Sequence, residues 1–108
     1  MKQVKAFIRK HKLGAVIRAL HKVKGLTGLN IVDCNGYGRG LVTAADPESG
    51  FHPGVKIEII CLDGLADTVV NVIEKAAHTG LKGDGKIYIL PVEQAVRIST
   101  GERGEGAV

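Results

Sequence analysis

The chain has 108 residues, 44% hydrophobic and 24% charged, which is typical of an ordinary globular domain. A chain this short buries roughly 65% of its unfolded surface, too little for two cores, which excludes a multidomain enzyme. The net charge of +4 is divided unevenly, because the first 32 residues hold eight Lys or Arg and no acid, which gives +8 there and −4 in the rest. A basic segment suits nucleic acid, but the four aromatic residues and the lack of a zinc-finger or RNP-like pattern favour a solvated basic face.

The amino terminus lacks the long apolar region and small-residue cleavage site of a signal peptide. No apolar run approaches the roughly 20 residues that span a bilayer. We therefore expect a cytoplasmic protein without membrane insertion. Cys34 and Cys61 each lie in an apolar run and form neither a CxxC pair nor a dense framework, so they are predicted to be buried, reduced thiols.

The first third of the chain predicts strand, helix and strand. Apolar residues at every second position predict a strand over residues 4–9. Apolar residues at helical spacing over 13–23 predict a helix that stops at Gly25. Residues 29–34 are short, apolar and partly β-branched, and predict a second strand that ends in the glycine-rich stretch 35–40.

A long loop follows, because residues 41–54 are rich in turn formers and show no sustained period. Loops of this length in compact domains are usually functional or mobile. Alternation resumes over residues 55–62 and predicts a third strand.

The remaining chain predicts a second helix and a fourth strand. Asp63 is the expected N-cap of a helix whose apolar face covers residues 65–76 and which stops at Gly80. Residues 86–92 predict the strand, and a short extended segment near 95–99 precedes a glycine-rich tail.

Two β-α-β units in one small chain predict an α+β fold, a ferredoxin-like βαββαβ sandwich with both helices on one face of an antiparallel sheet. The predicted strands also carry apolar residues on their second alternation: Phe7, Ile60, Leu62, Tyr88 and Leu90. No third layer remains in the chain to cover that face, so we expect self-association.

Three glycine-rich, basic elements are candidates for an anion site. Residues 79–87 join the second helix to the fourth strand, where glycine N–H groups could converge on a phosphate and Lys86 adds a charge; a helix cap followed by an Asp-Gly turn is the alternative. Residues 36–40 open the long loop, and residues 97–104 lie in the tail, where a frayed terminus is the alternative. None has Walker A or GxGxxG spacing. Together they favour a polyanion site.

Four motifs together resemble those of the PII signal-transduction proteins: Gly36-Tyr37-Gly38-Arg39, Val55-Lys56-Ile57-Glu58-Ile59, Thr79-Gly80 with Gly83-Asp84-Gly85-Lys86-Ile87, and Arg97 with Thr100-Gly101-Glu102. The resemblance covers the chain apart from the long loop. It implies one PII-like domain over residues 1–108, with the family's T-loop at about 39–54, its B-loop in the glycine-rich element 79–87, and a C-loop and tail at 97–108. It also implies a homotrimer that binds ATP or ADP between neighbouring subunits.

Carried over position by position, the resemblance implies that the glycine-rich B-loop and Lys86 cradle phosphates, with Arg97 adding charge. The base of the T-loop closes on the nucleotide, backbone groups of Ile60 meet the adenine, and Asn30 stands where a hydroxyl residue is usual. The nucleotide-binding residues implied in this way are Asn30, Gly38, Arg39, Gly40, Ile60, Gly83, Asp84, Gly85, Lys86, Arg97, Ile98 and Ser99.

The chain departs from the family's pattern around the loop. Gly40 replaces a glutamine that helps hold magnesium and 2-oxoglutarate, and Gly54 replaces a lysine that meets the 2-oxoglutarate carboxylate. Ser99 stands where a second phosphate-binding arginine is common. The loop is about five residues shorter than usual and has no tyrosine, so the family's uridylylation site is missing.

The resemblance implies a non-enzymatic regulator. ATP or ADP, with magnesium as a compatible ion, would select loop conformations, and the loop would dock on a transporter, enzyme or transcription factor in nitrogen-related regulation. The alternative is a trimeric small-molecule or metal sensor, like bicarbonate- or metal-efflux-linked PII-like proteins or the CutA proteins. Four histidines and two cysteines could supply ligands, but no pair has a recognised metal spacing, so we predict no metal site.

Overall fold

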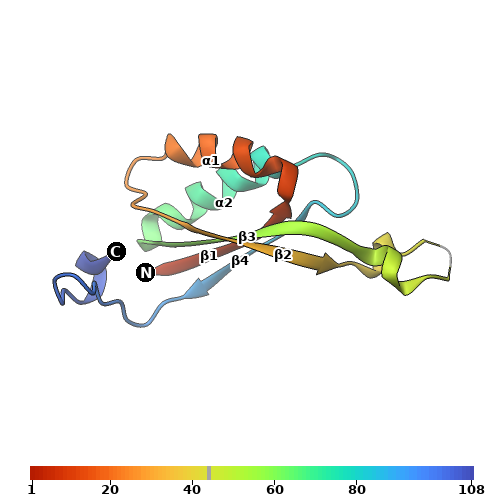
Figure 1. Cartoon of the computed structure of the whole chain (residues 1–108). Helices are drawn as coiled ribbons and strands as arrows, with labels where there is room; N and C mark the ends of the chain where they lie inside the picture. The colour runs from red at the N-terminus through yellow and green to blue at the C-terminus, as the bar shows by residue number, and fades with distance from the viewer. Residues whose placement is uncertain (44) are drawn as a thin grey trace.

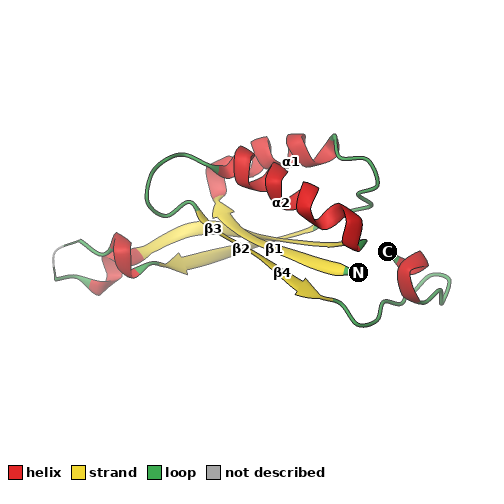
Figure 2. Ribbon diagram, turned by 180° about the vertical axis from the view of Figure 1, so that it is seen from behind, coloured by secondary structure: helices red, strands yellow, loops and turns green. Residues whose placement is uncertain are grey.

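The computed structural model describes residues 1–43 and 45–108. The strands β1 (Lys2–Arg9), β2 (Asn30–Tyr37), β3 (Phe51–Cys61) and β4 (Gly85–Pro91) form one antiparallel sheet in the order β2-β3-β1-β4. The helices α1 (Leu13–His21) and α2 (Asp63–Ala77) both cover the same face of this sheet, as Figures 1 and 2 show from opposite sides. The predicted α+β, ferredoxin-like sandwich is confirmed.

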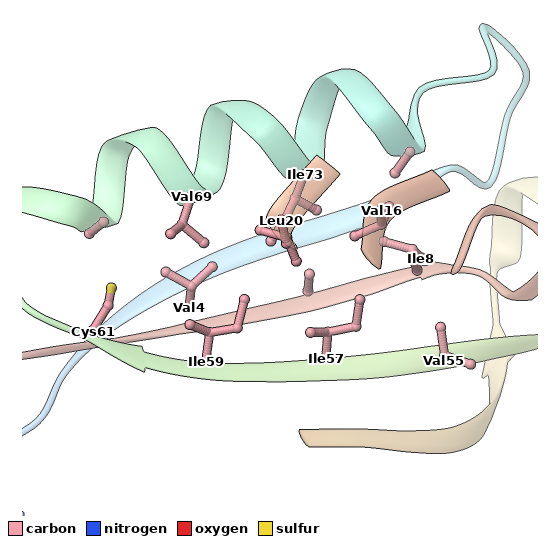
Figure 3. Close-up of a cluster of buried hydrophobic side chains, with 13 residues drawn as sticks. Val4, Ile8, Val16, Leu20, Val55, Ile57, Ile59, Cys61, Val69 and Ile73 are labelled. Atoms are coloured by element: carbon pink, nitrogen blue, oxygen red, sulfur yellow. The ribbon is translucent and has the colours of Figure 1, made fainter. Parts of the chain in front are cut away.

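The hydrophobic core lies between the helices and the covered face of the sheet (Figure 3). Because side chains alternate along a strand, every second residue of β1 points to the helices, and Val4, Ala6 and Ile8 are at most 5% exposed. The other large members come from β3 and from the two helices: Val55, Ile57, Ile59, Cys61, Val16, Leu20, Val69 and Ile73. Both cysteines are free thiols, as predicted, but only Cys61 is buried, whereas Cys34 is partly exposed. Burial raises the pKa of Cys61.

The other face of the sheet, which we call the open face, has no cover within the described part of the chain. Residues directly opposed across two strands share a face. The register places Lys5 opposite Tyr88 and Gln3 opposite Ile60 on the open face, where Ile60 and Tyr88 are 36% and 47% exposed. The ring of Phe7 meets that of Tyr88 edge to face, with 6.2 Å between centroids. The second apolar alternation is therefore exposed in a single protomer.

Strand β2 continues past its predicted end. The sequence suggested that glycine would end the strand before residue 35, but residues 35–37 pair with residues 51–53 of β3. The rings of Tyr37 and Phe51 pack across the two strands, with centroids 4.9 Å apart, and this contact offsets the weak strand preference of glycine. Pro53 fits into β3 because β1 ends opposite Gly54, which leaves one edge of β3 free beyond that point.

The connection between β2 and β3 therefore covers residues 38–50, instead of the predicted 39–54. We call residues 38–50 the interstrand loop. It begins with a hydrogen bond of 3.0 Å from the N–H of Gly38 to the carbonyl of Gly50. Ser49 Oγ then donates to the carbonyl of Asp46 at 2.7 Å and accepts from the N–H of Thr43, also at 2.7 Å. The described part of this loop is thus internally hydrogen-bonded.

The helix ends differ from the predicted caps. α1 ends at His21 and α2 at Ala77, both before the glycines expected to stop them, Gly25 and Gly80. Asp63 is the first residue of α2 instead of its N-cap, which is Leu62. The carboxylate of Asp63 accepts a hydrogen bond from the amino group of Met1 at 2.7 Å. That hydrogen bond lowers the pKa of Asp63.

The C-terminal segment, residues 92–108, folds back on itself. The N–H of Arg97 donates to the carbonyl of Glu102 at 2.8 Å, and the N–H of Gly104 to that of Ala95 at 3.0 Å. The extended segment predicted near 95–99 is reduced to one bridge, between Val96 and Arg103. Across residues 1–43 and 45–108, no helix has both the length and the apolar character needed to cross a bilayer.

Candidate functional site

Residues 78–84 connect α2 to β4, and we call them the glycine turn. The carboxylate of Asp84 organises this turn: it accepts from the N–H of Thr79 at 2.7 Å, from the Thr79 hydroxyl, and from the N–H of Gly80 at 3.3 Å. The bonds from Thr79 are the main cause that lowers the pKa of Asp84 far below its usual range. Asp84 therefore shapes the turn as an anion.

Arg9, the last residue of β1, ties the glycine turn to the sheet. Its Nε lies 3.1 Å from Oδ1 of Asp84, and its Nη2 donates to the carbonyl of Lys82. Arg9 is not among the residues predicted from the sequence, because its partners are far away along the chain. Only the pairing of β1 with β4, which sets Ile8 opposite Gly85, brings Arg9 to the turn.

Glycines in the glycine turn and directly after it have positive φ values, as glycines in anion-binding nests often do. Gly83 and Gly85 have φ values of +89° and +104°, in the region that favours glycine. A Cβ on Gly85 would lie 1.7 Å from the carbonyl oxygen of Phe7, so only glycine fits there. Within the described part of the chain, the N–H groups of residues 82–84 form no hydrogen bond. These groups are available to an anion.

The glycine turn and the base of the interstrand loop line a hollow of about 630 Å³, which we call the loop-side hollow. It brings together part of the predicted binding set: Gly38, Arg39, Gly40, Gly83, Asp84, Gly85 and Lys86. Lys82 and His52 line it as well. Asp84 is the one carboxylate among the described residues of this lining, and its oxygens are already engaged, so the hollow presents an excess of positive charge.

Asn30 and Ile60 line a second hollow of about 480 Å³, which we call the tail-side hollow. Glu58, which the sequence analysis did not select, lines it too. Its carboxylate accepts from Nε2 of Gln3 at 2.6 Å and pairs with Nζ of Lys56 at 3.2 Å. Strand alternation already set Glu58 and Ile60 on one face, but the register that puts Glu58 opposite Asn30 required the structure.

The predicted C-loop residues Arg97, Ile98 and Ser99 lie on an exposed turn of the C-terminal segment. Nη2 of Arg97 donates weakly to the carbonyls of Gly106 and Val108, at 3.5 and 3.4 Å. The side chain of Ile98 is 99% exposed. None of the three C-loop residues lines either hollow within the described chain.

The predicted site residues therefore gather at opposite ends of the sheet. Gly85, which follows the glycine turn, pairs with Ile8, and Pro91, which precedes the C-terminal segment, pairs with Lys2. The six positions from Lys2 to Ile8 correspond to about 20 Å along the strand. Figure 1 shows the interstrand loop and the C-terminal segment projecting from opposite ends of the molecule. One protomer thus holds two separated halves of the predicted site.

The four histidines lie on different elements: His11 before α1, His21 at its end, His52 in β3 and His78 after α2. His78 Nδ1 lies 3.6 Å from a carboxylate oxygen of Asp84. Among the residues that the structure describes, no three His, Cys, Asp or Glu side chains are placed to hold a metal ion.

Comparisons with known proteins find relatives along the whole chain. The family model described as "Nitrogen regulatory protein P-II" matches residues 1–102. Proteins of that name from Azospirillum brasilense and, as P-II 1, from Escherichia coli K12 are 42% and 40% identical over 113 residues, covering all of both chains. The crystal structure of Arabidopsis thaliana PII bound to citrate superposes with a TM-score of 0.83 and 37% identity, covering 99% of this chain and 91% of that one.

The alignment with the A. brasilense protein spans 113 positions, whereas this chain has 108 residues. At least five positions of that alignment therefore hold a residue in the relative and none here. This difference has the size of the predicted shortening of the interstrand loop.

Proposed function

Because the chain belongs to the nitrogen regulatory protein P-II family, we propose that it binds ATP or ADP between the subunits of a homotrimer and controls a partner protein through its interstrand loop. The observation that carries this proposal is the separation of the two hollows. Each end of the sheet holds half of a nucleotide site, so a second copy of the chain would complete it.

The loop-side hollow would hold the phosphates. The N–H groups of residues 82–84, which form no hydrogen bond within the described chain, could donate to an anion. Arg39, Lys82 and Lys86 supply the positive charge that a polyphosphate needs. Asp84 contributes by holding the turn, since its negative charge and occupied oxygens make it unsuitable as a direct phosphate ligand.

The tail-side hollow of a neighbouring copy would hold the nucleoside. Asn30 offers both an amide donor and an acceptor, and the carboxylate of Glu58, fixed by Gln3, offers an acceptor for N–H or hydroxyl groups. Arg97, Ile98 and Ser99 on the exposed C-terminal turn would reach the phosphates from this neighbour, with Arg97 exchanging its long bonds to the tail for charge-assisted ones.

Magnesium would be held mainly by the nucleotide. Among the described lining residues of the loop-side hollow, Asp84 is the one carboxylate and it is fully engaged, and Gly40 has no side-chain oxygen. A bound magnesium ion would reduce the phosphate charge. We propose that the chain acts by binding and not by catalysis, as is general for P-II regulators.

The open face supports the trimer. Tyr88 and Ile60 are exposed on it and Phe7 is partly exposed, and association of three copies would bury them. The interstrand loop projects from the end of the sheet next to the phosphate half, so a nucleotide bound there lies beside the surface offered to a partner. We favour this regulator over a metal sensor because the loop-side hollow presents an excess of positive charge, which suits an anion as the ligand.

A mixing experiment tests the shared site. Lys86→Ala removes charge from the loop-side half, and Arg97→Ala from the tail-side half. Each variant should weaken ATP and ADP binding by about 1.5–3 kcal/mol, measured by calorimetry, because a charge-assisted contact is lost. When the two variants are unfolded together and reassembled in equal amounts, about a quarter of the sites should regain both residues and wild-type affinity.

Lys75→Ala, on the exposed side of α2, is the matched control and should bind as the wild type does. Unchanged affinity in both site variants would contradict the phosphate assignment. Loss in both without recovery on mixing would contradict a site shared between two copies.

A further inference from the structure

The interstrand loop contacts the glycine turn where the side chain of Leu41 meets Gly83. A Cβ on Gly83 would lie 3.1 and 3.4 Å from the two methyl carbons of Leu41. The same side chain lies against the base of its own loop, where a Cβ on Gly38 would be 3.3 Å from Cδ1 of Leu41. Leu41 therefore lies against two glycines that line the loop-side hollow, one in the interstrand loop and one in the glycine turn.

The loop's hydrogen bonds hold Leu41 in this place. The N–H of Leu41 donates to the carbonyl of Gly38 at 3.0 Å, so Arg39–Leu41 forms a short 3-10 helix. The bond between Gly38 and Gly50 closes the loop directly below that helix. The backbone of Leu41 is thus tied to the base of the loop.

Gly83 is in contact with a second segment as well. A Cβ on Gly83 would lie 3.2 Å from Nη2 of Arg9, the group that also donates to the carbonyl of Lys82. The residue that supports Leu41 thus belongs to the stretch 82–84, whose N–H groups are available to a phosphate. An anion that accepts hydrogen bonds from these groups would restrict the glycine turn and keep Gly83 in place against Leu41.

We propose that Leu41 couples nucleotide binding at the glycine turn to the conformation of the interstrand loop. This inference rests on the proposed function and names the residue through which the nucleotide acts. With phosphate bound, the turn is fixed, the contact between Leu41 and Gly83 persists, and the loop stays closed. Without phosphate, the turn moves through its positive-φ glycines, the contact is lost, and the loop opens. Because coupling is reciprocal, the same contact strengthens nucleotide binding.

Amide hydrogen exchange of residues 38–50, with and without saturating ATP, tests the proposal. Leu41→Ala removes the methyl carbons that contact Gly83. Val42→Ala is the matched control, because Cγ2 of Val42 packs against Gly50 inside the loop. We expect ATP to slow exchange in the wild type and in Val42→Ala. Leu41→Ala should bind ATP roughly five- to tenfold more weakly, yet its loop should exchange at the same rate with and without ATP.

Calorimetry on the same samples separates the possible failures. Wild-type protein that binds neither ATP nor ADP would overturn the proposed function and the coupling together. Nucleotide binding without any change in loop exchange of the wild type would overturn the coupling alone. The coupling would also be wrong if saturating ATP slowed the loop of Leu41→Ala as much as that of the wild type.

Discussion

The guanidinium of Arg9 and the carboxylate of Asp84 meet at 3.1 Å although 75 positions separate them in the sequence. Their side chains are 24% and 23% exposed, so solvent screens the pair only in part. The pair joins the end of a central strand to the turn that carries the free N–H groups. The shape of the candidate anion site therefore depends on correct pairing between β1 and β4.

Asp84 should make the free energy of unfolding depend on pH in the acidic range. Its pKa is lowered in the folded state, so it contributes stability that is present above its unfolded pKa of about 3.9 and is lost as the pH falls toward the folded value. Urea unfolding at a series of pH values should show a steeper loss below about pH 4 in the wild type than in Asp84→Asn. Asp67→Asn, at an exposed position of α2, should keep the wild-type profile. Equal slopes in wild type and Asp84→Asn would show that the Asp84 bonds add nothing to folding.

The centre of the core should be sensitive to truncation. Ile57 is fully buried between the sheet and the helices, so Ile57→Ala should lower the free energy of unfolding by about 2–5 kcal/mol through lost burial and a remaining cavity. Leu81 is 71% exposed in the glycine turn, and Leu81→Ala should change the free energy of unfolding by less than about 0.5 kcal/mol. Denaturant unfolding of both variants measures the difference, and similar losses would contradict the assigned core.

2-Oxoglutarate should bind weakly. If the family's glutamine and lysine contacts are lost at Gly40 and Gly54, two charge-assisted interactions of about 1.5–3 kcal/mol each are missing, which lowers affinity by about two to four orders of magnitude. Titration of the ATP–magnesium complex should then give no heat below about millimolar. A micromolar dissociation constant would show that another residue, such as Lys56 or His52, replaces the lost contacts.

The two glycine positions differ in what they accept, which suggests a gain-of-function variant. A Cβ on Gly40 meets no atom within 4 Å, whereas one on Gly54 would lie 3.1 Å from the carbonyl oxygen of Ile8. Gly40→Gln should therefore fold normally and bind 2-oxoglutarate more tightly than the wild type. Gly54→Lys requires β1 to shift and should lower stability. Equal 2-oxoglutarate affinity of Gly40→Gln and wild type would mean that the glutamine position alone does not limit binding.

The open face should control assembly. Light scattering should report about 34 kDa for a trimer of the 11.4 kDa chain. Placing charge on this face with the double variant Val32→Asp and Leu90→Asp should shift the mass to that of the protomer, because each carboxylate would lose hydration on association. Asn71→Asp, on the outer side of α2, should leave the trimer intact. A monomeric wild type at micromolar concentration would remove the basis for a site shared between subunits.

The sequence alone predicted the strands and helices in which regularly spaced apolar residues form one buried face. Val4, Ala6 and Ile8 alternate and Val16 and Leu20 recur at helical spacing, so burial against a single layer predicted both the strand and the helix. It failed where a contact from a distant segment decides the outcome. Gly36 stays in β2 because the next residue, Tyr37, packs on Phe51 of β3, and the ring of His52 lies so close to Gly36, with Nε2 2.7 Å from where a Cβ would be, that a larger residue would not fit. Both partners depend on the register.

The residues of the candidate site also fall into two groups, those that the sequence alone predicts and those that only the structure identifies. A glycine-rich motif indicates a turn with positive φ values from its own residues alone, so the glycine turn and Lys86 could be predicted from the sequence. Arg9, Glu58 and Leu41 could not, because each acquires its role from a partner on another element. The distribution of the site over two ends of one protomer also required the strand register, since no sequence pattern states which end of a strand meets which loop.

The hydrogen bond between Gly38 and Gly50 also bears on how such a protein diverges. The described residues beyond this bond, 39–43 and 45–49, project from the end of the sheet, outside the core (Figure 1). Chain can be added or removed there at a closure cost that grows only with the logarithm of loop length, about 0.6 kcal/mol for a doubling. The part of the loop that does not line the loop-side hollow can therefore change in length at little cost to the scaffold, whereas Arg39, Gly40 and Leu41 are tied to the ligand site.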